Sequence, residues 1–140
     1  MANSTRRKFI GTAAALAVTT TVATAMPVSL SPNVMEHQYP VVHHVFFWLK
    51  NPDSKADRDL LVAGVKTLSK IETVKGIHVG IVADTEKRDV IDSSWGVSEL
   101  LFFNDLAGQA VYQTHPIHLA FIEKYSHLWS KVVVYDIVQA

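Results

Sequence analysis

Residues 41–49 alternate in a way that predicts a β-strand. Val42, His44, Phe46 and Trp48 would point to one face of a sheet, and the residues between them to the other. Large apolar groups occur in both sets, which is typical of a strand with both faces covered. We therefore expect this first strand to be covered on each side.

A change of period after this strand predicts a helix over residues 55–73. The preceding residues 51–54 are of types that favour turns and helix caps. Apolar residues then recur at helical spacing and form a single stripe, while lysine and glutamate side chains face water. The stripe consists of Leu61, Val65, Leu68 and Ile71.

Three more strands follow from the alternation of apolar and other residues. They are predicted over residues 77–84, 97–103 and 132–138. Residues 85–94, between the second and third strands, are mostly polar and indicate a long loop at the rim of the sheet.

Two further helices are separated by a proline. Asp105 would cap the first of them, which runs through Thr114. His115 would end it, because a residue that precedes proline avoids helical geometry. The second helix is expected over residues 116–130, with Pro116 in the tolerated first turn.

The predicted order, β-α-β-β-α-α-β, is that of a ferredoxin-like α+β fold. In this fold a four-stranded antiparallel sheet carries its helices on one face. The first and last strands are apolar on both sides, so the other sheet face needs a partner to cover it. A second copy of the chain is the simplest partner. We therefore expect a homodimer, a dimeric α/β barrel in which two sheets enclose a shared interior.

The first 25 residues have the pattern of an export signal. Arg6 and Arg7 begin a positive cluster, an uncharged apolar run follows over residues 11–22, and small residues then predict cleavage after Ala25. The paired arginines resemble a twin-arginine signal, which the export machinery recognises. An ordinary secretory signal that happens to carry two arginines is the alternative.

Export predicts a periplasmic or secreted protein without a stable membrane anchor. The apolar run is short and only mildly hydrophobic, whereas a membrane span needs ~20 strongly apolar residues. Residues 26–40 contain three prolines and little periodicity, which predicts an extended N-terminal arm.

Charge and cysteine content exclude several classes of function. The chain has 13 basic and 13 acidic residues, and removal of the signal would leave a small acidic excess. No basic stripe remains that could follow a phosphate backbone, so we expect no nucleic-acid partner. Cysteine is absent from the sequence, which excludes disulfides and thiol catalysis.

The candidate chemistry lies between Tyr112 and His118. An imidazole can accept a proton near neutral pH, and a neutral phenol can donate a hydrogen bond to a carbonyl oxygen as enolate charge develops. With His118 as base and Tyr112 as donor, such a site could enolise a carbonyl compound. His115 precedes Pro116 and is interpreted as a helix cap, and His43 as a structural residue.

Metal binding is the competing use of these histidines. His115 and His118 are three residues apart, and His44 could add a third ligand. Pro116 lies between the first two, however, and no carboxylate is placed near them by its spacing. We therefore expect no metal site.

Several segments together resemble the stress-responsive alpha/beta barrel domain (Dabb) family. The resemblance covers residues 42–138, and it identifies residues 41–140 as the Dabb domain. The resemblance rests on the order and spacing of the matching segments more than on any single segment. The segments are His43–Lys50, Leu68–Ile71 with Gly76 and Gly80, Arg88–Ser94, Phe103–Asp105, Tyr112–His118 with Phe121, and Asp136.

The resemblance implies the dimeric barrel and suggests an activity. Plant relatives include a polyketide cyclase that closes an aromatic ring by an intramolecular aldol step, using a tyrosine and a histidine. Tyr112 and His118 occupy those two positions, and His44 corresponds to a further pocket histidine. A second histidine of that cyclase aligns with Val97, so the same reaction is not implied.

The resulting hypothesis is a homodimer that binds a small hydrophobic, carbonyl-bearing metabolite. Tyr112 and His118 would be catalytic, and the residues expected to contact the ligand are His44, Phe46, Trp48 and Phe103. Some relatives bind magnesium through backbone carbonyls that correspond to Leu68, Ile71 and Val74, but we expect no cofactor. A non-enzymatic, stress-protective or structural dimer with a filled interior is the alternative.

Overall fold

A computed structural model of the chain describes residues 39–140. The predicted export signal with Arg6 and Arg7, the cleavage site after Ala25 and nearly all of the predicted arm lie outside the described residues. All the predicted strands and helices of the domain lie within them.

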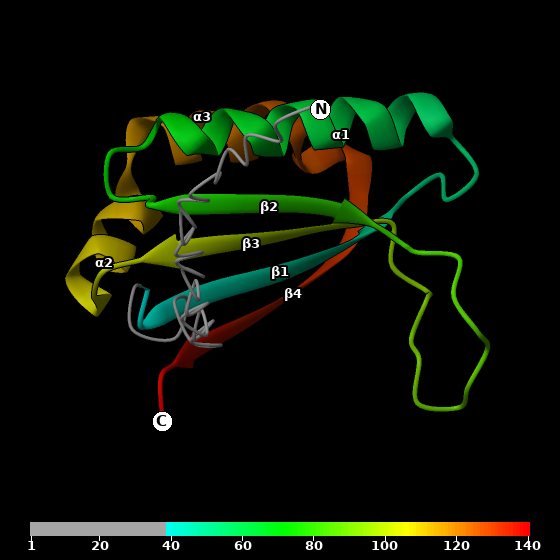
Figure 1. The fold of residues 1–140 in the computed structure, drawn as a ribbon. Coiled ribbons are helices and arrows are strands. Elements are labelled where there is room, and N and C mark those ends of the chain that lie inside the picture. Colours follow the sequence, from blue (N-terminus) through cyan, green and yellow to red (C-terminus); the bar gives the residue numbers. More distant parts are fainter. Residues whose placement is uncertain (1–38) are drawn as a thin grey trace, which may run out of the picture. The chain divides into compact units, whose positions relative to one another are not determined.

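The described part of the chain follows the predicted β-α-β-β-α-α-β order. Its elements are β1 (Val41–Leu49), α1 (Lys55–Lys66), the 3-10 turn η1 (Thr67–Lys70), β2 (Gly76–Ile81), β3 (Val97–Phe103), α2 (Leu106–Thr114), α3 (Pro116–Tyr125), the 3-10 turn η2 (Ser126–Leu128) and β4 (Trp129–Val138). The strands form one antiparallel sheet in the order β2-β3-β1-β4. Figure 1 shows α1 and α3 running side by side along one side of this sheet, so the predicted ferredoxin-like fold is confirmed.

Side-chain caps fix where the helices begin. The hydroxyl of Ser54 accepts the Asp57 amide at the start of α1, and Asp105 accepts the Gly108 amide at the start of α2. His115 caps α3 by accepting the Ile117 amide, as its place before proline predicts.

Two predicted helices are shorter than expected. The helix predicted over residues 55–73 ends at Lys66 and tightens into η1, because the backbone becomes extended at Ile71. The helix predicted over residues 116–130 ends at Tyr125, and Trp129 already belongs to β4. The predicted apolar stripe of α1 and η1 is nevertheless buried throughout.

The two faces of β1 differ in what covers them. Its odd-numbered residues, from Val41 to Leu49, are buried beneath the helices. Its even-numbered residues are half-buried on the opposite face, which we call the open face. There the ring of Phe46 lies 5.1 Å from that of Trp95 and 6.2 Å from that of Tyr135. The open face is therefore as apolar as the sequence predicts.

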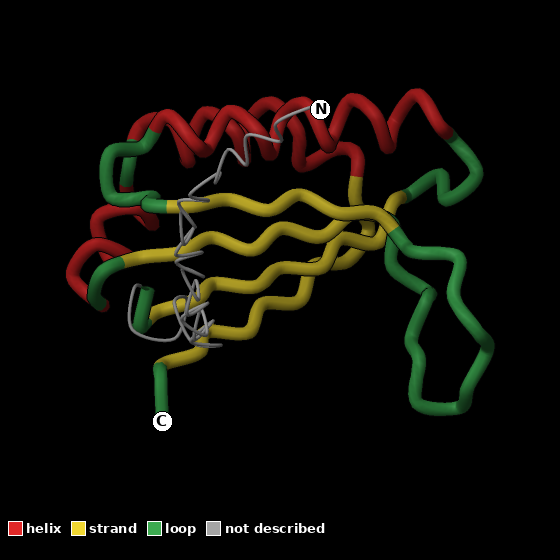
Figure 2. The backbone as a smooth tube through the Cα atoms, in the orientation of Figure 1, coloured by secondary structure: helices red, strands yellow, loops and turns green. Residues whose placement is uncertain are grey.

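Residues 82–96 form a long loop between β2 and β3, drawn in green at one end of the sheet in Figure 2. Two hydrogen bonds hold the end of the loop that precedes β3 against β1. The Trp48 indole donates to the Ser94 hydroxyl at 2.9 Å, and the Gly96 amide donates to the Phe47 carbonyl at 2.8 Å. Most of its remaining residues are exposed.

Candidate functional site

A cavity of about 230 Å³ lies between β1, β4 and the paired helices α2 and α3. Its inner wall is buried and includes His43, Glu99 and Tyr112. Its outer rim includes the exposed residues Ile122 and Val134. A small molecule would therefore enter at the β4 edge and meet the buried polar groups at the inner end.

Tyr112 and His118, the predicted pair, line this cavity together. Tyr112 lies in α2, and His118 is the third residue of α3. The break at His115 folds one helix back beside the other. The two ring centroids are 4.3 Å apart. Tyr112 is almost fully buried and His118 is half-buried.

The orientation of His118 leaves one ring nitrogen available as a base. Its Nδ1 lies 3.0 Å from the backbone carbonyl of Gln113. Because a carbonyl can only accept, Nδ1 carries the proton and Nε2 keeps its lone pair. Burial lowers the pKa of His118, and the charge of His43 lowers it further, against the raising effect of the Gln113 hydrogen bond. The ring is therefore neutral at neutral pH.

Glu99 is a buried carboxylic acid at the inner end of the cavity. Only 1% of the residue is exposed, and burial raises the pKa of its carboxyl to about 8. The Tyr112 hydroxyl donates to Oε1 over 3.5 Å, while Oε2 has no hydrogen-bond partner among residues 39–140. Burial and the neighbouring Glu99 raise the pKa of Tyr112, so both groups hold their protons at neutral pH.

His43 and Asp136 form a hydrogen-bonded pair beside Tyr112. Nδ1 of His43 lies 2.6 Å from Oδ1 of Asp136, and the His43 ring centroid lies 5.4 Å from that of Tyr112. His43 is buried, whereas half of the Asp136 side chain is exposed. The carboxylate therefore fixes the orientation of the His43 ring from the solvent side.

The expected position of His44 in this site is wrong. His44, Phe46 and Trp48 are even-numbered in β1 and lie on the open face, while the cavity lies on the helix-covered face. His43, interpreted as structural, occupies the place expected for His44. Both faces of β1 are apolar, so the alternation itself did not identify the face that meets Tyr112.

Phe103, also predicted to contact a ligand, lies in the core. Its ring packs 5.6 Å from Tyr112, but it does not line the cavity. The aromatic lining comes instead from Phe47, Phe121 and Trp129. These three rings pack against one another, with centroid distances between 5.0 and 6.4 Å.

Glu99 is not among the predicted site residues, although the sequence contains a signal for it. It is the acidic residue of the otherwise apolar or small segment from Val97 to Phe103. It also shares its sheet face with Val97 and Leu101, which are buried. A carboxyl group at an inward position of a buried strand is costly unless it has a partner or a use.

His115, considered above as a metal ligand, makes local contacts through its ring. Its Nδ1 accepts the Ile117 amide at 3.1 Å and its Nε2 faces Glu72 at 3.2 Å, so both nitrogens are engaged. Within residues 39–140 no three histidine or acidic side chains are grouped to hold a metal ion. No helix in this range is long and apolar enough to cross a membrane.

The backbone carbonyls to which the resemblance assigns magnesium binding include those of Leu68 and Ile71, which lie in a tight turn. The Leu68 carbonyl accepts the Ile71 amide at 3.1 Å, and the Ile71 carbonyl accepts the Val74 amide at 3.0 Å. These oxygens lie outside the cavity lined by Tyr112 and His118.

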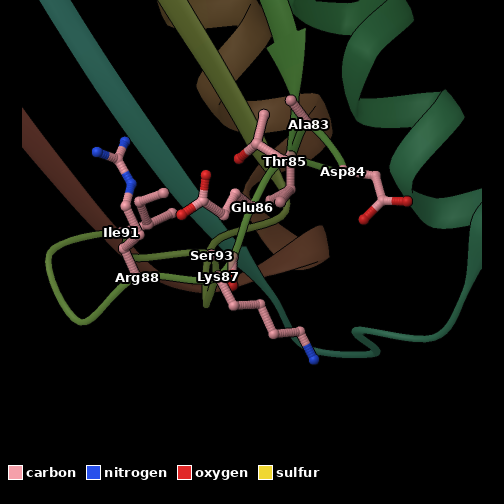
Figure 3. A pocket seen from close by; sticks show the side chains of 9 residues that line it. Ala83, Asp84, Thr85, Glu86, Lys87, Arg88, Ile91 and Ser93 are labelled. Carbon is pink, nitrogen blue, oxygen red and sulfur yellow. The ribbon is translucent and has the colours of Figure 1, made fainter.

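A second hollow, of about 420 Å³, lies within the loop of residues 82–96. Figure 3 shows the side chains that line it, and the charged ends of Asp84, Lys87 and Arg88 point in different directions. None of the predicted site residues lines this hollow. The cavity beside Tyr112 is therefore the better candidate for a functional site.

Comparison with known proteins agrees with this fold. The family described as Stress responsive A/B Barrel Domain (Dabb) matches residues 41–139. No curated protein matches the chain.

Three solved structures illustrate the likeness. An Arabidopsis thaliana protein is 24% identical, with a TM-score of 0.62, over 72% of this chain and 96% of that one. A hydroxynitrile lyase from Passiflora edulis is 20% identical, with a TM-score of 0.56, over 70% and 91%. A dimeric Bacteroides fragilis protein of unknown function with a ferredoxin-like fold is 20% identical, with a TM-score of 0.55, over 70% and 94%. At these identities the likeness concerns the fold.

Proposed function

This chain belongs to the stress-responsive A/B barrel domain (Dabb) family, and we propose that it binds a small, hydrophobic, carbonyl-bearing compound in the cavity beside Tyr112. The observation that carries the proposal is that Tyr112 and His118 line one cavity with their ring centroids 4.3 Å apart. Apolar groups such as Val45 and Phe47 form much of the remaining wall. An apolar wall with a few convergent polar groups is typical of small-molecule sites.

His118 acts in this proposal as a general base. Its Nε2 removes a proton from the carbon next to the ligand carbonyl, while Nδ1 stays bonded to the Gln113 carbonyl. The electron pair of the broken C–H bond forms a carbon–carbon double bond, and the carbonyl π pair moves onto oxygen. Addition of a solvent-derived proton to the same carbon gives hydrogen exchange, and addition of a proton to another carbon gives isomerisation. Attack of the enolate carbon on a second carbonyl would close a ring.

The enolate oxygen needs hydrogen-bond donors at the inner wall. The polar side chains there come from Tyr112, Glu99 and His43. A hydrogen bond of 2.6 Å to Asp136 holds the His43 ring, so the ring does not have to be oriented during the reaction. The chemistry involves no net gain or loss of electrons.

Hydrogen exchange into a simple ketone tests this function. Acetophenone is a single-ring ketone with exchangeable methyl protons. In deuterated buffer, the protein is expected to accelerate incorporation of deuterium into that methyl group, measured by proton NMR. If saturating protein leaves the exchange rate at that of buffer, the proposed acid–base function is contradicted.

We further propose that the open face is a homodimer interface. Tyr135 and Ile137 of β4 are 55% and 48% exposed on this face, beside half-buried Phe46. Contiguous apolar surface of this kind marks interaction sites, and the dimeric Bacteroides fragilis structure has the same fold.

Tyr135→Lys is expected to weaken the dimer, because each copy would bring a lysine into an apolar interface. The dimer dissociation constant should rise at least about tenfold, a factor that corresponds to ~1.4 kcal/mol. Light scattering over a concentration series measures it. Val132→Lys, on the other face of β4, is the matched control and should leave the mass unchanged. A monomer mass for the unmodified protein at micromolar concentration would contradict the dimer.

Export by the twin-arginine route is proposed from Arg6, Arg7 and the apolar run that follows them. Since that route accepts folded proteins, the domain could fold and bind its ligand before export. Arg6→Lys combined with Arg7→Lys is expected to abolish export of the protein, measured by cell fractionation in a host with this pathway. Undiminished export of the double variant would sink the twin-arginine assignment.

A further inference from the structure

Glu99 carries a carboxyl group into an apolar part of the core. It lies in β3 between Val97 and Leu101 on the helix-covered face, and all three residues are buried. Its β1 neighbour in the sheet register is Val45, which is apolar. No basic side chain forms an ion pair with it among the described residues. An unpaired carboxyl in such surroundings keeps its proton, because the charged form would lose its hydration.

The two oxygens of this carboxyl group have different surroundings. Oε1 accepts the hydroxyl of Tyr112 over 3.5 Å. Oε2 is buried and has no hydrogen-bond partner in residues 39–140. Glu99 lines the cavity. Since Tyr112 directs its single hydroxyl proton to Oε1, the acid proton on Oε2 is the donor left for a group inside the cavity.

We propose that Glu99 binds the carbonyl oxygen of the ligand through a protonated Oε2, and that Tyr112 positions Glu99 by donating to Oε1. The inference rests on the proposed function and names the ligand class more closely. The ligand is a neutral ketone or aldehyde whose oxygen points inward and whose α-carbon faces His118. A protonated carboxylic acid in an apolar site is an effective donor to a developing enolate oxygen.

Four other titratable side chains line the cavity together with Glu99. They come from every element packed there: His43 from β1, Tyr112 from α2, His118 from α3 and Asp136 from β4. Burial, the largest influence on Glu99, raises its pKa to about 8. Preference for a carbonyl ligand should therefore be lost as the pH rises through about 8, when Oε2 loses its proton.

A matched pair of probes tests the inference. Acetophenone and ethylbenzene have similar shapes, but only the ketone accepts a hydrogen bond. NMR titration of the intact protein at pH 6 should show acetophenone binding about 3- to 10-fold more tightly, the value of one hydrogen bond. Glu99→Gln retains a donor and should keep this preference at pH 6 and pH 10, whereas the unmodified protein should lose it at pH 10. Glu99→Leu should bind both probes equally.

Each other outcome overturns a specific statement. Equal binding of the two probes by the unmodified protein at pH 6 contradicts the role of Glu99 but leaves the apolar cavity as a binding site. A ketone preference that survives Glu99→Leu assigns the donor to another residue. Binding of neither probe contradicts the proposed function, and this inference with it. Infrared difference spectra between the protein and Glu99→Gln separately report the protonated carboxyl, whose carbonyl stretch should be present at pH 6 and absent at pH 10.

Discussion

Replacement of His118 by glutamine lowers the rate of deuterium exchange into acetophenone by about 10²- to 10⁴-fold, the usual contribution of a general base. Glutamine is similar in length and polar, but it cannot accept a proton at neutral pH. The cavity should therefore survive, and acetophenone should still bind. The measurement is proton NMR of the methyl group in deuterated buffer. The protein concentration is chosen so that the protein-catalysed exchange rate exceeds the buffer-catalysed rate.

The pH profile distinguishes a base from a structural histidine. Burial holds the pKa of His118 below its ordinary value of 6.5, so the exchange rate should fall only as the pH drops through a value below 6.5. His127→Gln is the matched control, because His127 is exposed in the 3-10 turn η2 and does not line the cavity. If His118→Gln keeps the full rate, His118 is not the base. If it loses ketone binding as well, its role is structural.

The unmodified protein is expected to lose folding stability as the pH rises, and replacement of Glu99 by glutamine should remove most of this loss. In the unfolded chain the Glu99 carboxyl ionises near 4.5, whereas in the folded protein its pKa is about 8. Below pH 4.5 the Glu99 carboxyl is protonated in both the folded and the unfolded state, and no stability is lost. Between these values the unfolded state releases its proton while the folded state keeps it, so stability falls by about 1.4 kcal/mol per pH unit. Above pH 8 the loss is complete, at about 5 kcal/mol.

Urea unfolding from pH 4 to pH 9 measures this effect as a difference between two proteins. Burial of His118 lowers its pKa and acts in the opposite direction, but it is common to both proteins. The free energy of unfolding of Glu99→Gln, relative to the unmodified protein, should therefore rise by several kcal/mol across this range. Glu123→Gln, which alters an exposed carboxyl on α3, should show no such rise. Parallel curves for the unmodified protein and Glu99→Gln would mean that Glu99 is ionised in the folded state.

The fold follows closely from periodicity. The β1 and β3 boundaries agree with the predicted strands at residues 41–49 and 97–103. The caps at Asp105 and His115 also follow from residue type, because each is a local interaction between a side chain and a nearby amide. The ends of α1 and α3 were less predictable. They tighten into 3-10 turns whose extent depends on packing rather than on local sequence.

The site was predicted only in part. Tyr112 and His118 lie six residues apart around a proline, so the local sequence was enough to bring them together. The strand residues that meet them depend on which face of β1 the helices cover. Because both faces carry large apolar groups, the choice between His43 and His44 required the three-dimensional arrangement.

The role of Glu99 was not predictable from its residue type. A glutamate in a strand is usually solvated, and its burial here results from the position of Tyr112 and the helices above β3. The pairing of His43 with Asp136 joins strands 93 residues apart in the sequence. Long-range register of this kind is set by the whole sheet and not by any local motif.

Nuclear Overhauser contacts from the methyl group of bound acetophenone test the central claim most directly. If the ligand binds in the cavity, this methyl group is expected to contact the rings of His118 and Tyr112 and to make no contact with His44 or Phe46 on the open face. Contacts to His44 and Phe46 without contacts to His118 would show that the ligand binds on the opposite side of the sheet, and the account would be contradicted.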